Sequence, residues 1–166
     1  MIETHPYGSF VPPQAKFLIL GSFTGKPEAG YDWFYSNKRN QFWSILEIVY
    51  GLKLDTKKSK QQLFTKLRIA ITDIIYQCER KKGINLDADL INLVYNTSGI
   101  EKILGQNEIE KVYFTSRYVE NKFRRLFKPA TVGLITLPSP SPRYAAMTKE
   151  EKIRKYREAF PKLKQQ

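Results

Sequence analysis

Residues 16–46 contain the side chains whose types and spacing best suit the binding of a flat ligand. An apolar run ends at Gly21 and Ser22, whose small size lets the backbone approach a ligand closely. Four aromatic side chains and then an amide follow: Tyr31, Trp33, Phe34, Tyr35 and Asn40. Aromatic rings stack on bases, and an amide can hydrogen-bond to a base or to a water molecule. These residues predict a base-binding pocket; a hydrophobic core built from the same rings is the alternative.

A phosphate-binding loop of the Walker A type is excluded at the same place. The segment from Gly21 to Lys26 looks similar, but its glycines are one residue too close together. Pro27 also stands where that motif needs a Ser or Thr to bind magnesium. The loop is therefore not expected to bind a nucleoside triphosphate in that way.

The scarcity of cysteine and histidine restricts the chemistry further. Cys78 is the only cysteine, so the chain can form no internal disulfide and no CxxC metal site. His5 is the only histidine, and we expect it to lie in a loose N-terminal segment. Catalysis by Ser-His-Asp or Cys-His and a zinc site are therefore not expected. Acid–base or polarising work would fall to carboxylates, amides, hydroxyls or backbone groups.

The charge of the chain points to a polyanionic partner. Among 166 residues, 28 are Lys or Arg and 16 are Asp or Glu, a formal net charge of +12. Such a balance favours nucleic acid or an acidic membrane surface, with a merely soluble basic protein as the alternative. The length and the 42% hydrophobic content predict one folded domain over 1–166. The N-terminus lacks the form of a signal peptide and no run reaches 18 apolar residues, so we expect a cytoplasmic protein.

The expected elements alternate between strands and helices. After an extended lead-in at 1–15, strands are predicted at 16–20, 68–75, 111–115 and 131–137. Helices are predicted at 40–50, 57–68 (a solvated one), 85–105 (one or two short ones), 116–127 and 148–161, with a polar loop at 76–83. This alternation predicts an α/β fold with a parallel sheet and helices on both faces. Ligands bind beyond the carboxyl ends of such strands, so residues 21–43, 73–80 and 138–144 should share one rim.

Four stretches in this order resemble the uracil-DNA glycosylase superfamily, and most closely its branch of DNA-deoxyinosine (hypoxanthine) glycosylases. They are LILGSFTG after the first strand, NQFW at 40–43, ITDIIYQCERK at 71–81 and LPSPSP at 137–142. The resemblance implies a three-layer α/β/α sandwich around a central four-stranded parallel sheet. It also implies a monomer that needs no metal or cofactor. Its activity would be hydrolysis of the N-glycosidic bond of a flipped, deaminated base in double-stranded DNA, leaving an abasic site.

The resemblance assigns roles to individual residues. Asn40 inherits the catalytic role of the Asn-x-Phe-Trp motif, although its position also suits a helix N-cap. Asp73 is a second catalytic candidate because it ends a predicted strand on the functional rim, with a salt bridge to Arg80 as the alternative. The base pocket is assigned to Gly21, Ser22, Phe23, Phe34 and Tyr35. Either Phe34 or Tyr35 would stack on the base, with Tyr31 and Trp33 as competitors, whereas Phe42 and Trp43 should pack inward.

Contacts with the DNA backbone are assigned to residues in loops on the same rim. Ser139, Ser141, Arg143, Lys38 and Arg39 can all donate hydrogen bonds to phosphates. A plain structural turn rich in proline is the alternative for residues 138–143.

The sequence departs from the family pattern at two positions, and these departures suggest alternative functions. Relatives often carry a polar residue at the positions of Phe23 and Leu137, and both side chains here are chemically inert. A glycosylase-like protein that binds DNA or damaged bases without cutting is therefore one alternative. An enzyme acting on free nucleotides or nucleosides is another, and the positive charge disfavours it.

Overall fold

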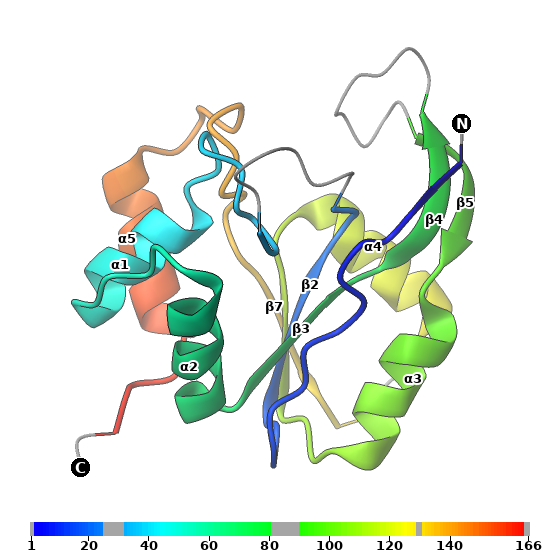
Figure 1. The fold of residues 1–166 in the computed structure, drawn as a ribbon, viewed down its shortest axis with the longest axis horizontal. Coiled ribbons are helices and arrows are strands. Elements are labelled where there is room, and N and C mark those ends of the chain that lie inside the picture. The colour runs from blue at the N-terminus through cyan, green and yellow to red at the C-terminus, as the bar shows by residue number, and fades with distance from the viewer. Residues whose placement is uncertain (1, 25–31, 81–89, 129–130, 165–166) are drawn as a thin grey trace.

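A four-stranded parallel sheet forms the centre of the molecule. The structure is a computed structural model, and it describes residues 2–24, 32–80, 90–128 and 131–164. In sheet order the strands are β3 (Ile69–Asp73), β2 (Phe17–Gly21), β6 (Lys111–Phe114) and β7 (Gly133–Thr136). All neighbouring pairs are parallel, so the carboxyl ends of the four strands meet at one edge (Figure 1). The predicted parallel sheet is confirmed.

Helices cover both faces of this sheet. The described helices are α1 (Phe42–Tyr50), α2 (Lys57–Leu67), α3 (Thr97–Gln106), α4 (Arg117–Leu126) and α5 (Lys149–Ala159). Helices α1, α2 and α5 lie on one side and α3 and α4 on the other (Figure 1). Along β2, Ile19 packs in the core between the sheet and helices α1, α2 and α5. Leu18 and Leu20 pack in the core on the opposite face, against α3 and α4. This alternation follows from the two-residue period of a strand. None of the described helices is long and apolar enough to cross a membrane.

Helix α2 is more than a solvated surface. It buries Leu63, Phe64 and Leu67 against the core, while its basic residues mostly face outward. Thr56 and Ser59 form a capping box at its start. The prediction of a solvated helix was therefore wrong for one face, because three apolar side chains at helical spacing are enough to anchor it.

A second, antiparallel sheet was not predicted. Its order is β1 (Ile2–Thr4), β4 (Ile75–Arg80) and β5 (Leu90–Tyr95). The polar loop expected at 76–83 is a strand up to Arg80, and part of the helical region expected at 85–105 is strand β5; residues 81–89 lie outside the described part. The predicted lead-in at 1–15 begins with strand β1, which pairs with β4. Sequence pattern missed this sheet because it is half exposed and mixes polar and apolar residues.

Candidate active site

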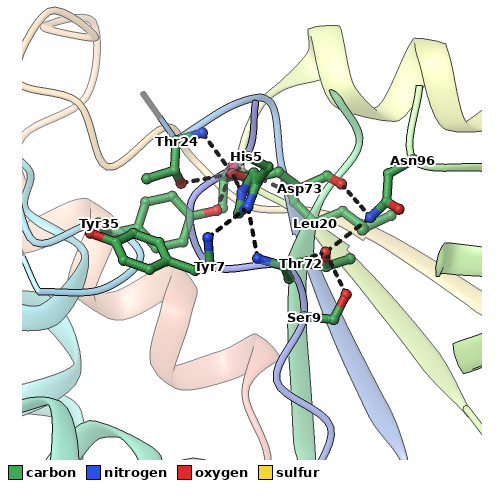
Figure 2. Close-up of polar contacts among 11 residues, drawn as sticks. His5, Tyr7, Ser9, Leu20, Thr24, Tyr35, Thr72, Asp73 and Asn96 are labelled. Atoms are coloured by element: carbon green, nitrogen blue, oxygen red, sulfur yellow. Dashed lines mark hydrogen bonds and ion pairs between the residues drawn. The ribbon is translucent and has the colours of Figure 1, made fainter. Parts of the chain in front are cut away.

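Asp73 is a buried carboxylate at the carboxyl end of β3. Its side chain is 2% exposed, and its Cα pairs with that of Gly21 at the end of the neighbouring strand. Oxygen Oδ2 accepts three hydrogen bonds of 2.7 Å, from His5 Nε2 and from the backbone N–H and hydroxyl of Thr24 (Figure 2). Three donors therefore converge on one carboxylate oxygen at the edge where ligands bind in parallel α/β folds.

His5 occupies the site instead of a loose N-terminus, so that prediction was wrong. Its side chain is 4% exposed, and its backbone N–H donates to the carbonyl of Tyr76 at 2.8 Å. Pairing of β1 with β4 carries the N-terminal segment to this place. Arg80, the partner considered for Asp73, forms an ion pair of 2.6 Å with Glu3 in the same pair of strands. No local pattern could reveal a contact between residues 5 and 73, because it depends on the unpredicted sheet.

Gly21 and the Tyr35 hydroxyl lie beside Oδ1, the other carboxylate oxygen of Asp73. A Cβ atom placed on Gly21 would lie 2.3 Å from the Tyr35 hydroxyl oxygen and 2.6 Å from Asp73 Oδ1. The Tyr35 hydroxyl donates to Thr115 Oγ1 at 3.3 Å, just beyond β6. Tyr35 also has a φ of 56°, a left-handed conformation that costs a non-glycine residue of the order of 1–3 kcal/mol. Only the absence of a side chain at Gly21 allows these groups to meet.

The predicted aromatic residues divide between core and site. Phe34 and Trp33 are buried in the core, where Trp33 stacks on Trp43 with ring centroids 5.8 Å apart. Tyr35 keeps partial exposure and packs on Phe42, centroid to centroid 4.4 Å. Phe42 and Trp43 are buried, as predicted. Tyr31 lies outside the described residues. Among Trp33, Phe34 and Tyr35, only Tyr35 therefore keeps exposed surface that could meet a ligand.

The first loop contributes mainly packing and backbone groups. The Ser22 carbonyl accepts from the backbone N–H of Ile75 at 3.0 Å, which ties the end of β2 to β4. The Phe23 ring meets the His5 ring edge to face at 5.9 Å and lies under the Arg80 guanidinium at 5.7 Å. Phe23 thus packs against His5, and His5 in turn hydrogen-bonds to Asp73.

Asn40 lies one residue before the N-cap of α1, which is Gln41. Its Oδ1 accepts from the backbone N–H of Phe42 at 2.9 Å, an Asx turn that leads into the helix, so the predicted N-cap at Asn40 was wrong by one residue. Among the described residues no acceptor lies against its amide nitrogen, which leaves two donors for a ligand. No hydrogen bond joins Asn40 to Asp73 in the described part of the chain. The two groups are linked indirectly, because Phe42 packs on Tyr35.

The loop at 137–144 is held rigidly beside Asn40. The backbone N–H of Gln41 donates to the Pro140 carbonyl at 2.8 Å, which places the two loops side by side (Figure 1). Lys152 of α5 is 1% exposed and donates to Gln41 Oε1 at 2.8 Å and to the Ser141 carbonyl at 3.1 Å. Burial lowers the pKa of the Lys152 amine. This lysine was not predicted from sequence, because one cation in a basic helix carries no distinguishing pattern.

The residues predicted to contact the DNA backbone lie in the loop before α1 and in the 137–144 loop, which are called the joined loops below. Lys38, Arg39 and Arg143 are exposed. The Ser139 and Ser141 hydroxyl oxygens accept from the backbone N–H groups two residues on, at 3.3 and 3.2 Å. Each hydroxyl can still donate its proton outward, as contact with a phosphate requires.

Comparison with known proteins shows the fold. No protein-family model and no curated protein matches the chain. One similar solved structure is the solution NMR structure of a "putative Uracil DNA glycosylase" from Methanosarcina acetivorans. It is 20% identical, with a TM-score of 0.68, and the match covers 96% of this chain and 97% of that one. The α/β fold predicted from sequence, with its four-stranded parallel sheet between helices, is therefore confirmed.

Proposed function

We propose that this protein is a monofunctional DNA glycosylase that hydrolyses the N-glycosidic bond of a flipped, deaminated base, with hypoxanthine as the preferred base. The observation that carries the proposal is the buried Asp73 carboxylate, which meets Gly21 and Tyr35 at the carboxyl edge of a glycosylase-like sheet. The choice of hypoxanthine is supported by the Asn-x-Phe-Trp motif that begins at Asn40. Uracil and xanthine are the competing substrates.

The DNA would be held by the joined loops. The exposed side chains of Lys38, Arg39 and Arg143 would neutralise phosphates, and the Ser139 and Ser141 hydroxyls would donate to them. A duplex hides the glycosidic bond, so the nucleotide must be extruded before it can react. The rigid 137–144 loop supports this step, since a fixed loop can hold a distorted backbone at no further ordering cost.

The bond would break with charge separation. The electron pair of the C1′–N bond leaves with the base, and positive charge develops on the sugar. The Asp73 carboxylate would favour that transition state, and the Asn40 amide nitrogen would donate to the departing base or orient a water molecule. The water oxygen then bonds to C1′, and the proton that it releases neutralises the base. No cofactor enters this balance.

A non-catalytic DNA-binding protein is the second candidate. Two apolar side chains favour it: Leu137 is 2% exposed in the core, and Phe23 packs on His5. Relatives in the resembled family often use polar groups at these positions to activate water. This candidate predicts tight, salt-sensitive duplex binding without release of a base.

Excision from defined duplexes tests the proposal. Duplexes with one hypoxanthine, uracil or xanthine would be incubated with excess protein and then treated with alkali, which cleaves at abasic sites. Wild type should give breaks fastest at hypoxanthine. Asn40→Ala should lose most of this activity, and Asn40→Ser is the matched control because it keeps a capping oxygen without the amide. If Asn40→Ser is as active as wild type, Asn40 acts only as a cap.

A further inference from the structure

His5 has both of its ring nitrogens engaged. Nε2 lies 2.7 Å from Asp73 Oδ2, and Nδ1 accepts from the backbone N–H groups of Tyr7 at 3.2 Å and Gly8 at 3.0 Å (Figure 2). A nitrogen that faces two N–H donors carries no proton of its own. The single ring proton must therefore sit on Nε2, from which it is donated to Asp73.

The surroundings of the ring preserve this arrangement. Aromatic side chains contact it from three directions, with ring centroids 5.4 Å away for Phe34, 5.9 Å for Phe23 and 6.3 Å for Tyr7. Figure 2 shows the N-terminal segment passing across the end of β3, with Ser9 bonded to Thr72 one residue before Asp73. A flip of the ring would place a C–H group against the carboxylate and lose all three hydrogen bonds.

We propose that His5 is a positioning residue: a neutral imidazole, locked as the Nε2–H tautomer, that orients the Asp73 carboxylate. Together with the two donors of Thr24 it holds Oδ2, so that Oδ1 is directed toward Gly21 and Tyr35. His5 is not the catalytic base, because neither nitrogen offers a lone pair to a substrate. The catalytic consequence of this lock rests on the proposed glycosylase function, whereas the lock itself does not.

The tautomer can be measured without any substrate. His5 is the only histidine in the chain, so its two ring nitrogens give unambiguous signals in a long-range ¹H–¹⁵N spectrum of the ¹⁵N-labelled protein. The lock predicts a protonated Nε2 and an unprotonated Nδ1 at neutral pH. A proton on Nδ1, or fast averaging of the two forms as in an exposed histidine, would overturn the proposal whether or not the protein cleaves DNA.

The positioning role is tested by paired variants. In His5→Gln an amide N–H can replace Nε2–H, whereas the shorter side chain of His5→Asn cannot reach Asp73. Single-turnover excision should fall about tenfold or more in His5→Asn, the effect of one hydrogen bond to a charged group, and should largely recover in His5→Gln. Glu3→Gln is the matched control, because it breaks the ion pair with Arg80 in the same segment without touching Asp73.

A double variant separates positioning from general loosening. If His5 acts through Asp73, His5→Asn should have no further effect on excision in an Asp73→Asn background. Additive losses, or a loss in Glu3→Gln equal to that in His5→Asn, would contradict the positioning role. Absence of excision by wild type would instead refute the proposed function. The tautomer measurement would then still test whether His5 is held as the Nε2–H tautomer.

Discussion

Replacement of Gly21 by alanine should damage the site more than the fold. The new methyl group would lie 2.3 Å from the Tyr35 hydroxyl oxygen, 2.6 Å from Asp73 Oδ1 and 3.2 Å from Tyr35 Cζ. None of these atoms yields easily. The Tyr35 ring packs on Phe42 at 4.4 Å, and the other oxygen of Asp73 accepts three hydrogen bonds.

The expected loss of stability follows from these contacts. Overpacking of a well-packed site costs about 1–3 kcal/mol, and loss of the bond from Tyr35 to Thr115 adds about 1 kcal/mol. For a chain of this size each kcal/mol lowers Tm by about 2–4 °C. Gly21→Ala should therefore melt roughly 4–16 °C below wild type, by the same estimate. Excision should fall by more than the folded fraction, because Tyr35 and Asp73 are displaced.

A second substitution identifies the cause. Tyr35→Phe removes the atom nearest to the new methyl group, so the Gly21→Ala/Tyr35→Phe double variant should be more stable than Gly21→Ala alone. Thermal unfolding of the four proteins measures this coupling. If Gly21→Ala is as stable as wild type, or if Tyr35→Phe adds to the damage, the crowding at the end of β2 is not as described.

Three further outcomes are expected. Lys152→Met should leave the protein folded but weaken duplex binding about tenfold. The reason is that it removes the hydrogen bonds to the Gln41 side-chain carbonyl and the Ser141 backbone carbonyl, which join the two loops. Equal affinity of variant and wild type by fluorescence anisotropy would contradict this. Arg143→Gln should reduce the slope of log affinity against log salt by about 1, and an unchanged slope would remove Arg143 from the DNA contact. Hydrogen bonds from Thr136 and from an arginine one turn on lower the pKa of Glu120. Glu120→Gln should therefore cost about 1 kcal/mol at pH 7, and this difference should shrink as the pH falls through the folded-state pKa, which lies below that of the unfolded chain; denaturant unfolding that shows an undiminished difference in acid would refute it.

The central sheet could be predicted because its strands are local patterns. Phe17–Gly21 is a short apolar run, and Ile69–Asp73 begins with another, as is typical of buried parallel strands. The helix expected at 148–161 is also observed as α5, and the Thr148 side chain caps it by accepting from the backbone N–H of Glu151.

The second sheet and its contribution to the site could not be predicted in this way. Strand β4 contains Gln77, Glu79 and Arg80, and polar residues of this kind are also typical of a loop. Without β4 there was nothing to place β1, and without β1 nothing carried His5 to Asp73. The environment of a catalytic candidate thus depended on pairing across more than 60 residues.

The candidate site was predicted in part. Gly21, Tyr35 and Asp73 were selected from sequence, and the structure brings these three together. Phe34 was selected by the same reasoning but is fully buried, because aromatic content alone does not distinguish a pocket wall from a core. The catalytic role of Asn40 remains a prediction.

Comparison of wild type with Asp73→Asn tests the central claim most directly. Asparagine can keep its carbonyl oxygen in the place of Oδ2 and accept the same three hydrogen bonds, while the negative charge is lost. The measurement is the single-turnover release of free hypoxanthine from a duplex, with duplex affinity measured in parallel. Wild type should release hypoxanthine, and the variant should release it at least about 100-fold more slowly at unchanged duplex affinity. Release at the wild-type rate by Asp73→Asn, or no release by wild type, would contradict this claim.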